Sequence, residues 1–215
     1  MTLEEVAEKL KDKSSKTARG WTPDDTHGDE TYGLNFTRIL EVARGMKTDA
    51  VLADELYAST NHDMKVLATV IDDPKSYTLD ELYKRTEQLY PSPFAEKFCR
   101  QVLAQSDHAV HFINEWIAEG NDAEKAFAYY TLGEVAKLNK RLSDDFFANY
   151  LDDISDNVHQ ESDFVKESMY WAIKSICARD ACLNEKCAEV ARKIGALRLS
   201  KGKVLELRRV EKMMA

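Results

Sequence analysis

The stretch NHDMKVLATVIDDP, residues 61–74, decides the fold class that we expect for this chain. Its apolar residues recur at spacings of three and four, which places them on one side of an α-helix: Met64, Leu67, Ala68 and Ile71. Asn61 has a side chain suited to capping the first turn, and Pro74 disfavours helical angles at Asp73. The predicted helix has one apolar face, so a neighbouring element must cover it.

The same helical pattern recurs along most of the chain, and no segment shows the sustained alternation that is typical of strands. We expect further helices over residues 2–12, 35–46, 48–58, 78–89, 92–105, 106–117, 122–138, 143–154, 162–178, 183–194 and 200–213. Three helix starts carry capping pairs, namely Thr2 with Glu5, Thr78 with Glu81, and Ser92 with Pro93. Residues 13–34 lack a helical period and are expected to form a loop or an ordered arm.

Broad apolar stripes on about a dozen helices are buried when antiparallel helix pairs stack in layers. We therefore predict an all-α fold, a right-handed α-solenoid of stacked antiparallel helix pairs with HEAT-like repeats and an ARM-type superhelix. We expect a single domain over residues 1–215, with an N-terminal helix and loop arm over 1–34 and helical repeats over 35–215. A concave face of such a solenoid is the expected binding surface.

Composition limits the class of protein. The N-terminal segment lacks the apolar run of a signal peptide, and no stretch approaches the roughly 20 apolar residues that cross a bilayer. The four cysteines form no C-x-x-C pair, and we expect them to be reduced and mostly buried: Cys99, Cys177, Cys182 and Cys187. These features favour a cytoplasmic protein with no membrane contact, and we expect a monomer.

Charge is unevenly distributed along the chain. The net charge is -8, yet residues 143–163 hold seven acids and no Lys or Arg, whereas residues 186–215 hold nine Lys or Arg against three Glu. Such asymmetry predicts either a basic surface on an acidic protein or two solvated helix faces. His108, His111 and Glu115 have a spacing that could hold a metal, but no other ligand converges on them, so we predict no metal and no cofactor.

The opening helix and its approach resemble the bacterial DNA alkylation repair enzymes, which are HEAT-like-repeat alkylpurine DNA glycosylases. The matching pieces are Tyr32-Gly33-Leu34, Glu55-Leu56-Tyr57, His62 to Ala68, and Asp73-Pro74. Weaker similarity continues through NEWIAEG (114–120), VKESMYWAIKSI (165–176) and RKIGALRLSKGK (192–203). The resemblance covers about residues 30–203 and identifies the chain as a divergent member of the family.

The resemblance implies removal of cationic N3- or N7-alkylated purines from DNA. The family uses a Trp and an Asp four residues apart on one helix, an Arg on the facing helix, and a second Trp. A carboxylate stabilises the positive charge that develops on the sugar, and aromatic faces attract the charged nucleoside.

Only part of this machinery is carried over. In this sequence Ser92 stands at the position of the first Trp, and Glu96 stands at the position of the Asp. Ala126, beside Lys125, stands at the position of the Arg, and Trp171 matches the second Trp. We therefore expect Glu96 to be the candidate catalytic carboxylate and Trp171 to be the aromatic residue in the cleft. The alternatives are a solvated carboxylate near a helix start for Glu96 and core packing for Trp171.

DNA is the expected partner, bound by a basic strip made of Lys65, Lys125, Lys174, Lys201 and Lys203. His62 is either a polar anchor in its turn or a nucleic-acid contact. The rival hypothesis is a non-catalytic HEAT-repeat scaffold that binds a protein or peptide, which the acidic balance and the missing Trp favour.

Overall fold

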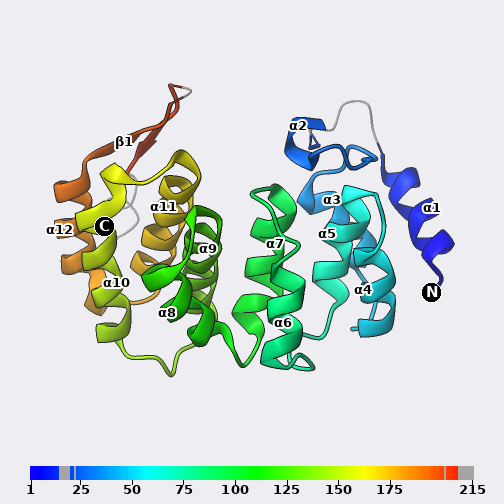
Figure 1. The fold of residues 1–215 in the computed structure, drawn as a ribbon, viewed down its shortest axis with the longest axis horizontal. Coiled ribbons are helices and arrows are strands. Elements are labelled where there is room, and N and C mark those ends of the chain that lie inside the picture. Colours follow the sequence, from blue (N-terminus) through cyan, green and yellow to red (C-terminus); the bar gives the residue numbers. More distant parts are fainter. Residues whose placement is uncertain (15–19, 22, 201, 208–215) are drawn as a thin grey trace. The chain divides into compact units, whose positions relative to one another are not determined.

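The computed structural model describes residues 1–14, 20, 21, 23–200 and 202–207. Regular structure in these ranges is helical apart from one hairpin and one isolated bridge. Figure 1 shows the helices and the hairpin. The chain forms two compact units, Met1–Asp107 and His108–Ala215. The predicted single domain over 1–215 stays a prediction.

Helices of the first unit lie close to the predicted positions. They are α1 (Leu3–Lys13), α2 (Pro23–Thr26), α3 (Phe36–Ala43), α4 (Ala50–Tyr57), α5 (His62–Ile71), α6 (Leu79–Thr86) and α7 (Pro93–Gln101), followed by the 3-10 turn Leu103–Gln105. The predicted caps are confirmed at α1, α5, α6 and α7, where a side-chain oxygen accepts from a free backbone N–H of the first turn. The capping residues are therefore a reliable local signal in this chain.

Helix α5 is the centre of the first unit. It packs against α3, α4 and α7, which answers the question of what covers its apolar face. Val66 and Leu67 are fully buried among side chains that include Ile39 and Leu56. The α5 helix is therefore buried on most of its surface rather than along one stripe.

The segment between α1 and α3 is an ordered arm over its described residues. Glu30 pairs with Asn61 in an isolated parallel bridge, and the His62 backbone N–H donates to the Glu30 carbonyl at 2.8 Å. The buried Asp63 carboxylate accepts from Thr31 Oγ1 at 2.7 Å and from the Tyr32 backbone N–H at 2.6 Å. These bonds attach the arm to the first turn of α5.

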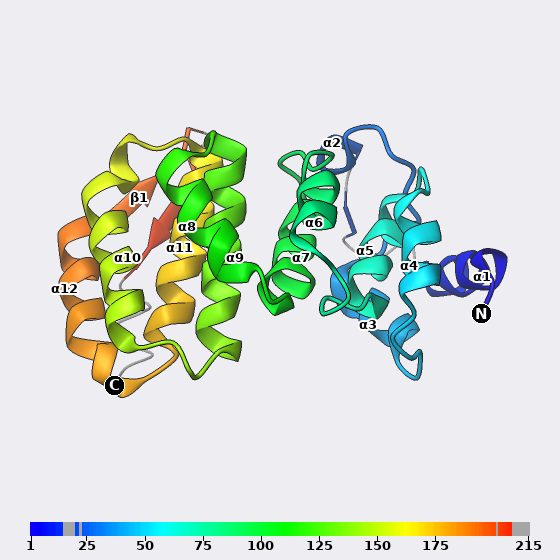
Figure 2. The same cartoon turned by 60° about the horizontal axis from the view of Figure 1, so that its bottom comes forward.

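The second unit contains α8 (Ala109–Glu119), α9 (Asp122–Leu138), α10 (Asp144–Asn157), α11 (Asp163–Cys177) and α12 (Asn184–Ile194), with 3-10 turns at Val158–Gln160 and Ala181–Leu183. Helix α9 packs against both α8 and α11, and α10 packs against α12. Figure 2 shows these helices side by side with their axes roughly aligned. This is the layered arrangement of helix pairs that the apolar stripes predict.

The prediction of a helix over 200–213 is wrong where the structure describes it, because a β-hairpin forms there. Strand β1 (Ala196–Arg198) pairs antiparallel with β2 (Val204–Glu206), with Leu197 opposite Leu205. Both of these leucines are buried, and their strand neighbours are exposed. Gly202 has a φ of 77°, which closes the turn between the strands and which a glycine adopts without strain. Residues 208–213 of the predicted helix lie outside the described residues.

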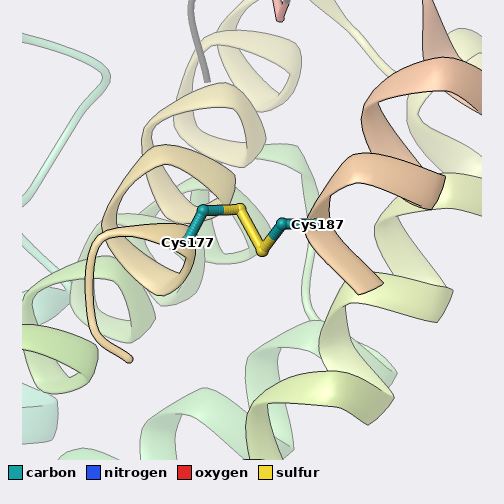
Figure 3. The surroundings of a disulfide bond; sticks show 2 residues. All are labelled: Cys177 and Cys187. Carbon is teal, nitrogen blue, oxygen red and sulfur yellow. A yellow bond between two sulfur atoms is a disulfide. The ribbon is translucent and has the colours of Figure 1, made fainter. Parts of the chain in front are cut away.

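The expectation of reduced cysteines is also wrong for one pair. Cys177, at the end of α11, and Cys187, in α12, form a disulfide with a Cα–Cα distance of 5.8 Å (Figure 3). Cys99 is buried and Cys182 is exposed, and neither forms a disulfide with a described residue. The bond links α11 to α12, which a short loop also connects. The spacing of the cysteines in the sequence did not predict this pairing.

Among the described residues, none of the helices combines the length and the apolar character that crossing a membrane requires.

Candidate nucleic-acid interface

Glu96, the predicted catalytic carboxylate, lies on α7 with two cations around it. Its Oε1 atom accepts from Lys97 Nζ at 2.9 Å and from Arg100 Nη1 at 2.6 Å. Burial alone raises the pKa of Glu96, but Lys97 and Arg100 outweigh it, and the pKa lies below its ordinary value. The three side chains together carry a charge of about +1, so they disfavour a second positive charge nearby.

The two lost family positions have structural roles. Ser92, which stands where the first Trp is expected, is buried, and its hydroxyl caps α7 by accepting from the Ala95 N–H at 3.2 Å. Ala126, which stands where the Arg is expected, is fully buried in α9. Ser92 is only 7% exposed and Ala126 is fully buried, and neither offers the aromatic face or the guanidinium expected at its position.

Trp171 lies on α11 against α9. A Cβ atom at Gly133 of α9 would come within 2.8 Å of the Trp171 ring, so the glycine allows the indole to lie close to the α9 backbone. The Lys137 ammonium is 3.9 Å from the ring centroid, and it also pairs with Glu134 at 3.1 Å. Lys174 and Tyr170 are neighbours on α11, with the Lys174 ammonium 5.6 Å from the Tyr170 ring centroid. We call these four side chains the Trp171 surface: Lys137, Tyr170, Trp171 and Lys174.

Three of the predicted DNA-binding lysines are engaged in ion pairs. Lys65 Nζ is 2.6 Å from Asp29, Lys125 Nζ is 3.5 Å from Glu161, and Lys203 Nζ is 2.5 Å from Glu167. Lys174 makes no ion pair with any described residue, and it remains partly exposed. Lys201 lies outside the described residues. The basic strip read from the sequence is therefore partly neutralised by local acids.

The acidic and basic stretches of the second unit pair with each other. Lys186 of α12 forms an ion pair with Asp152 of α10, and Lys193 Nζ is 2.5 Å from Asp156. Because α10 packs against α12, the two charge runs lie on adjacent helices. Exposed pairs of this kind contribute only about 0–1 kcal/mol each, but they reduce the basic surface that charge counting predicts.

His62 is neither a DNA contact nor a hydrogen-bonded anchor. Its side chain is fully buried, and neither ring nitrogen has a hydrogen-bond partner within the described ranges. The ring lies 4.7 Å from the Trp21 ring and 6.5 Å from the Phe94 ring, centroid to centroid. Burial lowers the pKa of His62 to about 4, so the imidazole is neutral at physiological pH.

A network in the first unit involves residues that the sequence did not single out. The Arg85 guanidinium lies 4.5 Å from the Tyr57 ring centroid and donates through Nη2 to Asp54 and to the Tyr77 hydroxyl. Both tyrosine hydroxyls donate to the buried Asp72, at 2.8 and 2.9 Å. These residues come from α4, from α6 and from the connection between α5 and α6, so no sequence spacing links them.

Three residues of this network, Asp54, Tyr57 and Arg85, line a pocket of about 190 Å³. The lining residues that matter for the argument below are Asp54, Tyr57, Lys65, Arg85, Tyr90 and Phe94. The pocket therefore brings three aromatic rings together with two cations and one carboxylate.

His108, His111 and Glu115, whose spacing could hold a metal, are not among the converging ligand groups of the described residues. His111 pairs with Glu115 at 3.2 Å, and both side chains are exposed. One other group within the described residues brings metal-ligating atoms within 4.8 Å of one another, namely Asp144, Asp180 and Cys182. Asp180 there accepts from the Cys182 N–H, and Asp144 lies 3.7 Å from Arg179, so local contacts account for this cluster.

Helix pairs stacked in layers define a helical-repeat protein, and a solved structure has the same fold. That structure is of a protein from a new family related to the HEAT-like repeat DNA glycosylases with affinity for branched DNA structures. The TM-score is 0.85 at 20% sequence identity, over 99% of this chain and 93% of the other. The predicted HEAT-like-repeat fold class is confirmed. The C-terminal hairpin was not part of the prediction.

The sequence profile of the DNA alkylation repair enzyme family matches residues 2–193. The chain therefore belongs to this family, which confirms the resemblance seen in the sequence. A search of curated proteins gives no match.

Proposed function

We propose that this protein binds DNA through the Trp171 surface and that it does not release alkylated bases by the carboxylate mechanism of its family. Membership of the DNA alkylation repair enzyme family supports DNA as the ligand. The structural relative is described as having affinity for branched DNA structures, which favours a branched substrate here as well.

The observation that carries the binding proposal is the composition of the Trp171 surface. Lys137 and Lys174 come from adjacent packed helices and flank two partly exposed aromatic rings. Ammonium groups neutralise phosphates, and aromatic faces accept exposed bases. An aromatic surface of this kind binds unstacked or branched DNA better than an intact duplex.

The state of Glu96 argues against catalysis. Its Oε1 atom already has two cationic partners, and the residues at two other family positions, Ser92 and Ala126, are buried. A carboxylate stabilises a sugar cation only when its charge is not compensated by neighbours. We therefore assign a structural role to Glu96.

The test compares two double lysine variants in binding to a labelled four-way DNA junction, measured by fluorescence anisotropy. Lys137→Ala/Lys174→Ala is expected to weaken binding at least about tenfold at ~50 mM salt and to lower the salt slope by about 1.8, since each phosphate contact contributes about 0.9. The control, Lys186→Ala/Lys193→Ala, removes two cations from α12 and is expected to leave affinity within about twofold, because exposed ion pairs contribute little. An equal loss in both variants would contradict the proposal.

A protein-binding scaffold is the second candidate. The net charge of -8 and the pairing of Lys65, Lys125 and Lys203 with acids favour it. Absence of junction binding by the wild type at ~50 mM salt, where phosphate contacts are strong, would support the scaffold and remove the DNA proposal.

We also propose that the protein acts as a monomer in the cytoplasm. The family to which the chain belongs supports this location. Thiols are kept reduced there, so the Cys177–Cys187 bond would form under oxidising conditions.

A further inference from the structure

The pocket of the first unit has the size of a site for one flat ring system. Its volume is about 190 Å³. A cavity of about 150 Å³ holds a benzene molecule, whereas drug-sized ligands occupy about 300–1,000 Å³. The ligand that fits is therefore a single heterocycle, with the rest of its molecule outside.

The pocket walls favour a planar aromatic ligand. Tyr57, Tyr90 and Phe94 supply three rings, and the Tyr57 and Phe94 centroids are 6.1 Å apart at an interplanar angle of 54°. Tyr90 is held in place because its hydroxyl donates to the Thr26 carbonyl at 3.2 Å and its ring lies 4.2 Å from that of His27. Rings fixed in this way accept a flat ligand at little entropic cost.

Arg85 gives the pocket hydrogen-bond donors in fixed positions. The hydrogen bonds that it makes within the described residues all use Nη2, so Nη1 and Nε keep their donors for a ligand. Its plane is fixed between the Tyr57 and Tyr77 rings, at 4.5 and 5.6 Å. Nη1 and Nε lie on different edges of the guanidinium, so each can donate singly to a ring or exocyclic acceptor of a base, such as N7 of a purine.

The charges around the pocket favour an uncharged ring. Arg85 is paired with Asp54, and Lys65 is paired with Asp29 at 2.6 Å, so the two cations are each compensated. A free anion would gain little there, whereas a neutral base would bind through its faces and its edge. The Lys65 ammonium still lines the pocket, where a backbone phosphate could approach.

We propose that this pocket binds one unpaired base, with a purine preferred, of the DNA that the protein binds. A paired base in a duplex is stacked between its neighbours, so only a base that is unpaired or extruded can enter. The proposal deepens the DNA-binding function above and rests on it. It places a base-recognition site in the first unit, on residues of α4, α6 and α7.

The test places the fluorescent base 2-aminopurine at an unpaired position of a branched DNA and, in a second DNA, at a paired position. Wild-type protein is expected to change the fluorescence at the unpaired position only. Gln88→Ala/Tyr90→Leu is expected to reduce the response at least about fivefold, because it removes a pocket ring and an amide. Gln101→Ala, which makes the same Gln to Ala change outside the pocket, is the control and is expected to behave as wild type.

Anisotropy of the same samples separates the two proposals. If the DNA binds but the 2-aminopurine signal is unchanged, or if the pocket variant responds as wild type does, the pocket proposal is overturned while DNA binding stands. The exposed Gln88→Ala change alone is measured as well, so that a folding defect of the Tyr90 variant does not decide the outcome.

A titration with free mononucleotides covers the case in which no DNA binds. NMR spectra are recorded with dGMP and with dTMP, and dGMP is expected to shift the Arg85 Nε–H signal more strongly than dTMP. No shift with dGMP, or an equal shift with both nucleotides, overturns the proposal independently of DNA binding.

Discussion

Arg100 and Glu96 lie one helical turn apart on α7, and the Arg100 guanidinium donates to the Glu96 carboxylate at 2.6 Å. Lys97 donates to the same oxygen. Both cations are mostly buried, since 12% of the Lys97 side chain and 17% of the Arg100 side chain are exposed. The carboxylate therefore compensates two cations that have little access to water.

Glu96→Ala is expected to lower the free energy of unfolding by about 1–3 kcal/mol, because two poorly solvated cations lose their partner. Urea unfolding checks this, with Glu87→Ala as a control at an exposed position, for which a change within about 0.5 kcal/mol is expected. Unchanged stability together with loss of 7-methylguanine release from methylated DNA would instead make Glu96 a catalytic group.

Gly133→Ala tests the packing of Trp171 on α9. The added Cβ would meet the indole at 2.8 Å and the Ala172 Cα at 3.2 Å, so the ring or the helix must shift. We expect a loss of about 1–3 kcal/mol in unfolding free energy and a change in tryptophan fluorescence, because overpacking at a helix contact is destabilising. An unchanged emission spectrum and unchanged stability would show that Trp171 does not rest on α9.

The buried His62 predicts a pH dependence of stability. Burial lowers its pKa from 6.5 to about 4, with Asp29 opposing the shift and Lys65 adding to it. The unfolded chain therefore binds more protons between these values, and folding stability falls as the pH drops from about 6.5 towards 4. The loss attributable to His62 between pH 7 and pH 4 is about 3 kcal/mol.

His62→Leu removes this contribution. The difference in unfolding free energy between pH 7 and pH 4 is expected to be smaller in His62→Leu than in the wild type. His111→Leu, at an exposed histidine, is expected to keep the wild-type pH dependence. If His62→Leu and wild type lose the same stability on acidification, His62 is not buried as a neutral imidazole.

The Cys177–Cys187 bond is expected to stabilise the second unit under oxidising conditions. The two residues are 10 apart in sequence, and closing a loop of that length is worth about 2–3 kcal/mol. Cys177→Ser/Cys187→Ser is expected to lose this amount without reductant, whereas the exposed Cys182→Ser is expected to lose little. Identical stability of the wild type with and without dithiothreitol would mean that the bond does not form in solution.

Much of the helical fold could be predicted because the signals are local. Asn61, Thr78 and Ser92 cap the helices at the positions predicted from their types. Apolar spacing places most helix ends within a few residues. Arg100 follows Glu96 by four residues, so this pair could have been read from the sequence, whereas the adjacent Lys97 has no such spacing signal.

The hairpin was missed although its signal is present. Leu197, Leu199, Leu205 and Leu207 are buried and alternate with exposed residues on either side of a turn at Gly202. The apolar stretches are short and many charged residues surround them, so the sequence pattern looks more like the end of a helix than like a hairpin. Period-two alternation over only three or four residues is a weak signal next to helical propensity.

The pocket and the charge pairs could not be predicted because their members are far apart in sequence. Arg85 meets Asp54 across 31 residues, and Lys193 meets Asp156 across 37. Only the packing of helices brings such pairs together, so charge runs overstated the basic surface. The contacts of the arm also depend on tertiary packing. The Asp63 carboxylate accepts hydrogen bonds from Thr31 and Tyr32, which lie more than 30 residues earlier in the chain.

Binding of a four-way DNA junction by the wild-type protein, titrated from ~50 to ~200 mM salt, tests the central claim most directly. The account predicts binding at the lower salt that weakens steeply as salt rises, with no 7-methylguanine released when the junction is methylated. Binding that is absent at ~50 mM salt, or base release that Glu96→Ala abolishes, would contradict it.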